Sequence, residues 1–197
     1  ISLYNHFSSS VDSISQFSNI LNIQDISYCQ FMTKNNGGLF FDNALMFYPE
    51  SGSVYSLIDM NLYLMEKFNF LTRDIIFFAQ DIFGNQFCFK NNQIFLFFIE
   101  SGELEYIANE FNEFLEILEE EYDYLTGVAV KKKWEESHVQ LKFGERLCPK
   151  KPFILGGGYE LDNFYNMETY KNLDYNSNIA IQLHGIPDKT KVKIIFK

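Results

Sequence analysis

Three β-rich segments follow one another between residues 75 and 100, and this run constrains the fold more than any other feature of the sequence. The segments are Ile75–Asp81, Gln86–Lys90 and Ile94–Glu100. Only Phe83-Gly84-Asn85 and Asn91-Asn92 stand between them. Connections this short, with Gly and Asn in them, join neighbouring antiparallel strands. The run therefore predicts an antiparallel meander.

A helix with an acidic outer side is predicted directly after the meander. It opens at Ser101-Gly102, and its acidic face spans Glu103–Tyr122. Apolar residues recur along the other side at helical spacing: Leu104, Ile107, Ala108, Phe111, Leu115 and Leu118. Ten carboxylates and no Lys or Arg occur between Glu100 and Asp123. Such a run is usually a solvated outer face. A concentrated negative field also accelerates encounter with a cationic protein, so a role in binding a partner stays open.

The rest of the chain shows weaker signals for secondary structure. Helices are predicted over Val11–Leu21, from Asp25 to the Asn36-Gly37-Gly38 turn, over Leu57–Phe70 and over Tyr175–His184, and strands over Leu39–Phe41, Ala44–Tyr48 and Lys191–Phe196. Gly127 ends the acidic helix, and Lys131–Lys133 is interpreted as a solvated turn. Neither an internal repeat nor a long Pro/Ser/Gly linker interrupts the sequence, so residues 1–197 are predicted to form one domain.

Charge and composition limit the classes of partner. The chain has 197 residues with a net charge of −10, and 47% of the residues are hydrophobic, which is enough for a core without metal or disulfide support. Phosphate backbones and anionic lipids repel an acidic protein, so nucleic acid and membrane surfaces are poor partners and a basic protein is a good one. The longest apolar runs fall well short of the ~20 residues of a membrane helix, and a secretion signal is not visible. We expect a cytoplasmic protein.

The usual constellations of catalytic or metal-binding residues are missing from the sequence. His6, His138 and His184 are scattered without metal-ligand spacing, and a GxSxG motif does not occur. Gly156-Gly157-Gly158 follows an apolar stretch but lacks the Lys-Ser/Thr of a phosphate loop, so a backbone turn is the better interpretation. No cofactor and no metal are expected.

Cys148 is the one candidate nucleophile. Arg146, Lys150 and Lys151 lie near it in the sequence, and positive neighbours lower the pKa of a thiol. A base is not found nearby in the sequence. Enzymatic activity at Cys148, or in a pocket under the hairpin, is therefore kept only as a minor hypothesis.

Several segments occur in an order that resembles a known family. They are Gly37–Phe40, Phe77–Phe87 and Phe97–Glu103, and together they resemble the SMI1/KNR4 family of the SUKH superfamily over about residues 20–125. The tail, 146–159, is similar to that of the longer bacterial members. Phe114 departs from the pattern, because relatives often have Trp at this place in the acidic helix.

The resemblance implies an α+β fold, SUKH-like, in which helices pack against a largely antiparallel sheet and which has no catalytic apparatus. The core would span about 20–125, and 126–197 would be a C-terminal elaboration. Bacterial members are taken to be immunity proteins that neutralise a toxin, often a nuclease. We therefore expect an immunity protein that binds a basic cognate toxin domain, with a regulatory scaffold protein as the alternative. The expected contact residues are Asp81, Glu100, Glu113, Glu116, Glu119 and Glu120.

Overall fold

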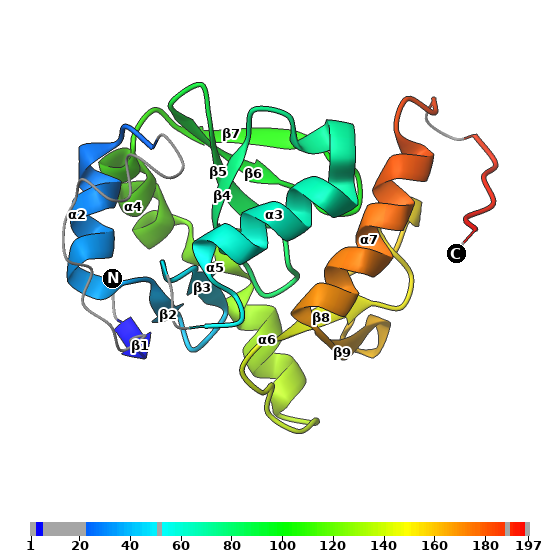
Figure 1. Cartoon of the computed structure of the whole chain (residues 1–197). Helices are drawn as coiled ribbons and strands as arrows, with labels where there is room; N and C mark the ends of the chain where they lie inside the picture. Colours follow the sequence, from blue (N-terminus) through cyan, green and yellow to red (C-terminus); the bar gives the residue numbers. More distant parts are fainter. Residues whose placement is uncertain (1–2, 6–22, 51–52, 188–189, 196–197) are drawn as a thin grey trace.

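The computed structural model describes residues 3–5, 23–50, 53–187 and 190–195 (Figure 1). The helix predicted over Val11–Leu21 lies outside the described residues. In the described part of the chain, seven strands form one sheet, and their order in space is their order in the sequence. The strands are β1 (Leu3–Asn5), β2 (Gly38–Phe40), β3 (Leu45–Phe47), β4 (Ile76–Gln80), β5 (Gln86–Lys90), β6 (Gln93–Phe97) and β7 (Leu104–Ala108).

Every strand of this sheet is antiparallel to the next, which confirms the predicted meander and the α+β class. The turn between β5 and β6 shows why the sequence determines this pairing. Lys90 pairs with Gln93, and the two residues between them, Asn91 and Asn92, have φ angles of 52° and 61°. Asn tolerates this left-handed conformation, which matches the twist of a two-residue hairpin.

Helices cover both faces of the sheet. In chain order they are α2 (Ile26–Asn35), α3 (Leu57–Phe68), α4 (Phe111–Glu120), α5 (Tyr122–Thr126), α6 (Val128–Glu135) and α7 (Thr169–Leu183), and short 3₁₀ turns occur at η1 (Asn69–Thr72), η2 (Phe153–Leu155) and η3 (Leu161–Asn163). The predicted helices from Asp25 and over Leu57–Phe70 are confirmed as α2 and α3.

Two neighbouring residues of β4 show which helices lie on which face. The ring of Phe78 is 5.7 Å from that of Phe114 in α4. The ring of Phe77 is 5.4 Å from that of Phe97, which in turn meets Phe68 of α3 at 5.3 Å. Successive side chains of a strand point to opposite faces. The sheet therefore separates α4 from α3, and all five rings are fully buried.

The predicted end of α2 is confirmed at the Asn-Gly-Gly turn. Asn36 has a φ of 47° and its backbone N–H donates to Met32 O, as a left-handed helix cap does. Gly37 also has a positive φ, 76°, and a Cβ there would lie 2.6 Å from the backbone oxygen of Phe47. Only glycine allows β3 to approach so closely.

The prediction of a helix from Ser101 to Tyr122 is wrong in its first half. Leu104–Ala108 forms β7, paired with β6 through Leu96↔Glu105 and Phe97↔Leu104, and α4 begins only at Phe111. The apolar residues at 104, 107 and 108 fit a helical period, but hydrogen bonding to β6 decides the outcome. A stretch of only five residues with apolar side chains is compatible with either structure until its neighbour is known.

Three predictions for the C-terminal part are corrected. Lys131–Lys133 is not a solvated turn but lies in α6, where the Lys131 side chain is buried. The last helix, α7, begins at Thr169 rather than near Tyr175, because the Glu168 carboxylate accepts from two backbone N–H groups of its first turn. No strand is formed by described residues 191–195.

A second, smaller core joins the C-terminal part to the meander. The strands β8 (Glu145–Pro149) and β9 (Phe164–Glu168) pair with each other. Leu147 of β8 and Phe164 of β9 are buried together with Ile82 and Phe83, which belong to the hairpin between β4 and β5. The backbone N–H of Leu147 also donates to Ile82 O at 2.8 Å. The hairpin is thus shared by both cores.

Candidate functional site

The outer side of α4 carries the acidic surface, which we define as Glu113, Glu116, Glu119 and Glu120. Glu116, Glu119 and Glu120 are exposed and Glu113 is half-buried. On the opposite side of the helix, Phe111, Phe114 and Leu118 are buried against the sheet. The helix is therefore held by its apolar side, and the predicted carboxylates of α4 lie together on one outer face.

Asp25 fixes the position of α4 relative to α2. Its Oδ1 accepts from the backbone N–H of Tyr28 in the first turn of α2 (2.9 Å). Its Oδ2 accepts from the backbone N–H of Phe111 at the start of α4 (2.7 Å). A carboxylate at the start of two helices also complements both helix dipoles. The sequence predicts Asp25 as the cap of α2, but its second role joins segments 86 residues apart.

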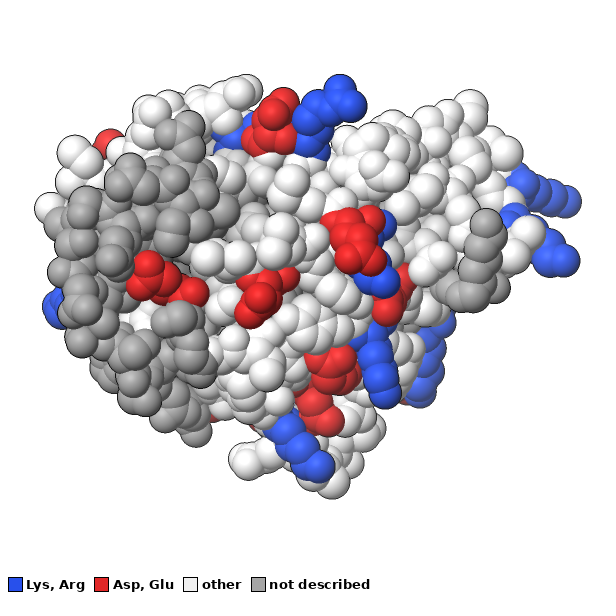
Figure 2. Space-filling view, viewed as in Figure 1, with Lys and Arg blue, Asp and Glu red and all other residues white. Residues whose placement is uncertain are grey.

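The carboxylates of the acidic surface reduce the stability of α4. Glu113 and Glu116, and Glu116 and Glu120, are like charges three or four residues apart, and each such pair costs about 0.2–0.5 kcal/mol. Glu119 and Glu120 lie in the last turn, where the helix dipole disfavours negative charge. Within the described residues, Glu113, Glu116 and Glu120 form no ion pair. The face drawn in Figure 2, on which α3 and α7 lie, differs from the acidic surface, because acidic and basic side chains are both scattered over it.

A groove of about 450 Å³ runs between α2 and α4, directly beside the acidic surface. It is lined by Ser27, Gln30, Phe31, Lys34, Asn35, Phe40, Leu115, Glu116 and Glu119. The apolar side chains suit the aliphatic part of a long basic side chain, and the carboxylates at the rim suit its charged end. The geometry can bind a basic protein surface.

Asp81 and Glu100, predicted as contact residues, do not belong to this surface. The Asp81 carboxylate is buried and accepts from the backbone N–H groups of Phe83 and Asn85, both at 2.8 Å. Glu100 is also buried, and its Oε2 accepts from the backbone N–H of Ile154 at 2.9 Å. Burial raises the pKa of each carboxyl group to about 7. Both hold loops in place, and a partner cannot reach them on the folded surface.

Cys148 does not have the environment of a nucleophile. Its side chain is fully buried in β8, and burial raises the pKa of the thiol to about 11. Arg146, Lys150 and Lys151, which are near Cys148 in the sequence, do not lower the pKa of the thiol below its ordinary value. Among the described residues, no three His, Cys, Asp or Glu side chains are grouped so as to hold a metal ion. The described helices are also all too short or too polar to span a membrane.

A comparison with models of protein families gives a match over the first part of the chain. The sequence model of the SMI1 / KNR4 family (SUKH-1) matches residues 10–117, more than half of the chain. The chain belongs to the SMI1/KNR4 family. The matched part begins after β1 and ends within α4, so it contains β2–β7 and two residues of the acidic surface, Glu113 and Glu116. The elements α5, α6, β8, β9 and α7 follow it.

A solved structure shares the fold beyond the SMI1/KNR4 region. The crystal structure of Atu4351 from Agrobacterium tumefaciens is similar with a TM-score of 0.58 and 13% sequence identity, over 89% of this chain and 83% of that chain. At this identity the likeness shows the fold alone. A search of curated proteins gives no match.

Proposed function

We propose that this SMI1/KNR4 protein is a bacterial immunity protein, which binds a cognate toxin in the cytoplasm and blocks its active site or substrate groove. Family membership supports a protein that acts by binding another protein, as an immunity or a scaffold protein. The proposal also treats residues 1–197 as one domain, since the C-terminal part shares the hairpin Ile82–Phe83 with the central sheet.

The acidic surface of α4 is the observation that carries the proposal. A toxin that cleaves nucleic acid needs a basic surface to bind phosphates, and an acidic inhibitor complements that surface. Charge complementarity of this kind steers encounter and raises the association rate by one or more orders of magnitude at low salt. The exposed carboxylates Glu116, Glu119 and Glu120 and the groove beside them are the proposed contacts.

The proposal is tested by co-expressing the protein with the toxin domain encoded beside it and scoring survival of the cells. Survival with this protein, and death without it, is the expected result. If the cells die in both cases although the protein is folded and abundant, the immunity function is wrong. Stable capture of a host regulatory protein instead would favour the scaffold function.

The contact surface is tested by matched charge reversals. Glu116→Lys changes the acidic surface, and Glu66→Lys makes the same change on α3, where the Glu66 side chain is 76% exposed on the other side of the sheet. Both variants change the net charge from −10 to −8. We expect Glu116→Lys to slow association with the toxin several-fold at low salt and to weaken its salt dependence. Equal effects of the two variants would contradict the assignment of α4.

A further inference from the structure

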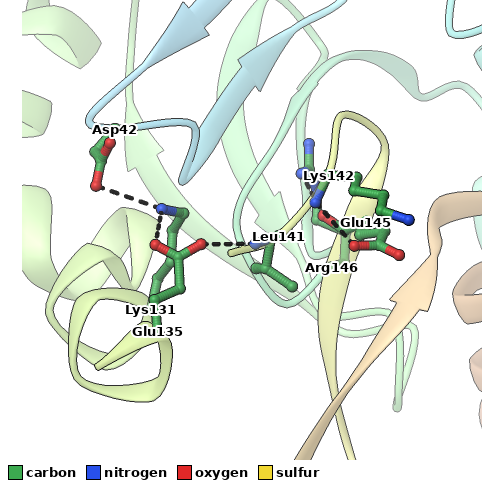
Figure 3. Close-up of polar contacts among 7 residues, drawn as sticks. All are labelled: Asp42, Lys131, Glu135, Leu141, Lys142, Glu145 and Arg146. Carbon is green, nitrogen blue, oxygen red and sulfur yellow. Dashed lines mark hydrogen bonds and ion pairs between the residues drawn. The ribbon is translucent and has the colours of Figure 1, made fainter. Parts of the chain in front are cut away.

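A second pocket, of about 320 Å³, lies away from the acidic surface, where α6, the chain before β8 and the β2–β3 turn meet (Figure 3). Four of its lining side chains are apolar: Leu39, Ile82, Leu141 and Phe143. The others include Asn43 from the β2–β3 turn, Lys131 from α6, and Arg146 from β8. Three separate parts of the chain thus bring two buried cations to one mostly apolar pocket.

Arg146 has an unpaired donor edge. The side chain is only 2% exposed, and its Nη1 donates to the backbone oxygen of Glu145 at 2.9 Å. Its Nε and Nη2 are buried and form no hydrogen bond with the described residues. These two nitrogens carry the parallel N–H groups that bind both oxygens of a carboxylate or phosphate. A buried donor pair of this kind is costly unless something accepts from it.

The acidic groups around the pocket are already engaged elsewhere. Lys131 pairs with Glu135 at 2.7 Å and with Asp42 at 3.3 Å, so these two carboxylates offset its charge (Figure 3). Glu145 accepts from the backbone N–H of Lys142 at 2.8 Å and from Asn166 at 3.0 Å. Among the described residues no ion pair is formed by Arg146.

Asp81 compensates Arg146 only in part, because the two buried side chains attract each other but form no ion pair with each other. Its carboxylate oxygens accept from Phe83 and Asn85 in its own hairpin loop. Burial raises the pKa of Asp81 to about 7, so near neutral pH a part of the population carries no charge there. The guanidinium group, in contrast, stays charged in proteins. Among the described residues, therefore, no anion is hydrogen-bonded to Nε and Nη2 of Arg146.

We propose that this pocket binds a small molecule with a carboxylate or phosphate group, which accepts from Nε and Nη2 of Arg146. The apolar side chains contact the body of the ligand, and the exposed Lys142 at the rim attracts its charge. Asn43, whose Oδ1 is buried without a hydrogen bond, offers an acceptor to a donor group on the body of the ligand and not to the anionic group itself. A volume of about 320 Å³ lies at the lower end of the range of about 300–1,000 Å³ that is typical of small-molecule sites. The site is independent of the acidic surface and of the proposed immunity function.

Nuclear magnetic resonance of the arginine side chains tests the proposal in the intact protein. The chain has two arginines, Arg146 and Arg73, and Arg73 is exposed. Inorganic phosphate and hexanoate are the two probes, with sodium chloride at matched ionic strength as control. We expect at least one probe to shift the Nε–H signal of Arg146 in a saturable way and to leave that of Arg73 unchanged. The probe that binds tells a phosphate ligand from an organic acid.

Two variants separate binding from folding. Arg146→Lys keeps the charge and loses the parallel donors, and Leu141→Trp keeps Arg146 and fills the pocket. At a probe concentration 100 times the dissociation constant, we expect a clear rise in the melting temperature of the natural sequence and little or none in either variant. The proposal is overturned if neither probe moves the Arg146 signal. It is also overturned if the probe stabilises folded Leu141→Trp as much as the natural sequence.

Discussion

Replacement of Asn61 by leucine is expected to destabilise the fold strongly, although the two side chains have similar size. Asn61 lies in α3, is only 4% exposed and contacts β4 with both ends of its amide. Its Nδ2 donates to Phe77 O at 2.7 Å and to Leu57 O at 2.8 Å. Its Oδ1 accepts from the backbone N–H of Phe77 at 2.8 Å. β3 pairs with β4 only at Ala79 and Gln80. At Phe77 the Asn61 amide takes the place of a neighbouring strand and pairs with the backbone of β4.

The size of the effect follows from the groups that lose their partner. In Asn61→Leu the N–H and C=O groups of Phe77 remain buried and unpaired, while Leu57 O keeps its helical bond. An unsatisfied buried polar group costs about 1–3 kcal/mol. The two together predict a loss of about 2–5 kcal/mol, reduced somewhat by the added apolar contacts of leucine. The free energy of unfolding of a typical domain is about 5–15 kcal/mol, so this loss is a large share of the total stability.

Urea unfolding followed by circular dichroism measures this loss. With a denaturant slope of about 2 kcal/mol per M, the midpoint is expected to fall by about 1–2.5 M. Asn112→Leu, at an exposed position of α4, is the matched control and should stay within about 0.5 kcal/mol of the natural sequence. If Asn61→Leu and Asn112→Leu unfold at the same midpoint, Asn61 does not bridge α3 and β4.

Three further predictions concern buried groups. The pKa of Asp81 in the fold, about 7, lies above its unfolded value of about 3.9, so the fold favours the protonated carboxyl group. The contribution of this group to the free energy of unfolding is present below about pH 4 and is lost as the pH rises through 7. The loss amounts to up to about 4 kcal/mol. Asp81→Asn should therefore flatten the fall of the urea midpoint between pH 4.5 and 7.5, and an unchanged slope would contradict this origin. A thiol reagent at pH 8 should leave Cys148, buried with a pKa of about 11, unmodified until urea is added; fast modification of Cys148 in the native protein would refute its burial. Phe114→Ala should cost about 3–5 kcal/mol, because the ring is fully buried; a calorimetric loss under about 1 kcal/mol would place the ring at the surface.

The meander and its turns could be predicted because local rules act on them. Phe-rich segments of five to seven residues with Asn-Asn and Phe-Gly-Asn between them leave few alternatives to hairpins, and β4, β5 and β6 appear close to the predicted places. The same holds for α2, where Asp25 caps one end and Asn36 the other. In these places the residues that decide the structure lie next to each other in the sequence.

The candidate site was predictable only in part. The spacing of Glu113, Glu116, Glu119 and Glu120 placed them on one side of a helix, and they lie together on the outside of α4. Asp81 shares their charge but not their surroundings. A carboxylate in a sequence gives no sign that backbone N–H groups of its own loop will enclose it, since this depends on the packing of the loop.

By itself, the sequence determined an acidic chain with a large aromatic core, an antiparallel meander and a negative outer helix. Only the tertiary structure decided that Leu104–Ala108 is a strand, that Asn61 completes the pairing of β4, and that Lys131 and Arg146 lie buried at one pocket. The physical reason is common to all of them. Periodicity and local propensity are properties of neighbouring residues, whereas hydrogen-bond pairing, burial and the partner of a charge depend on segments that meet only when the chain has folded.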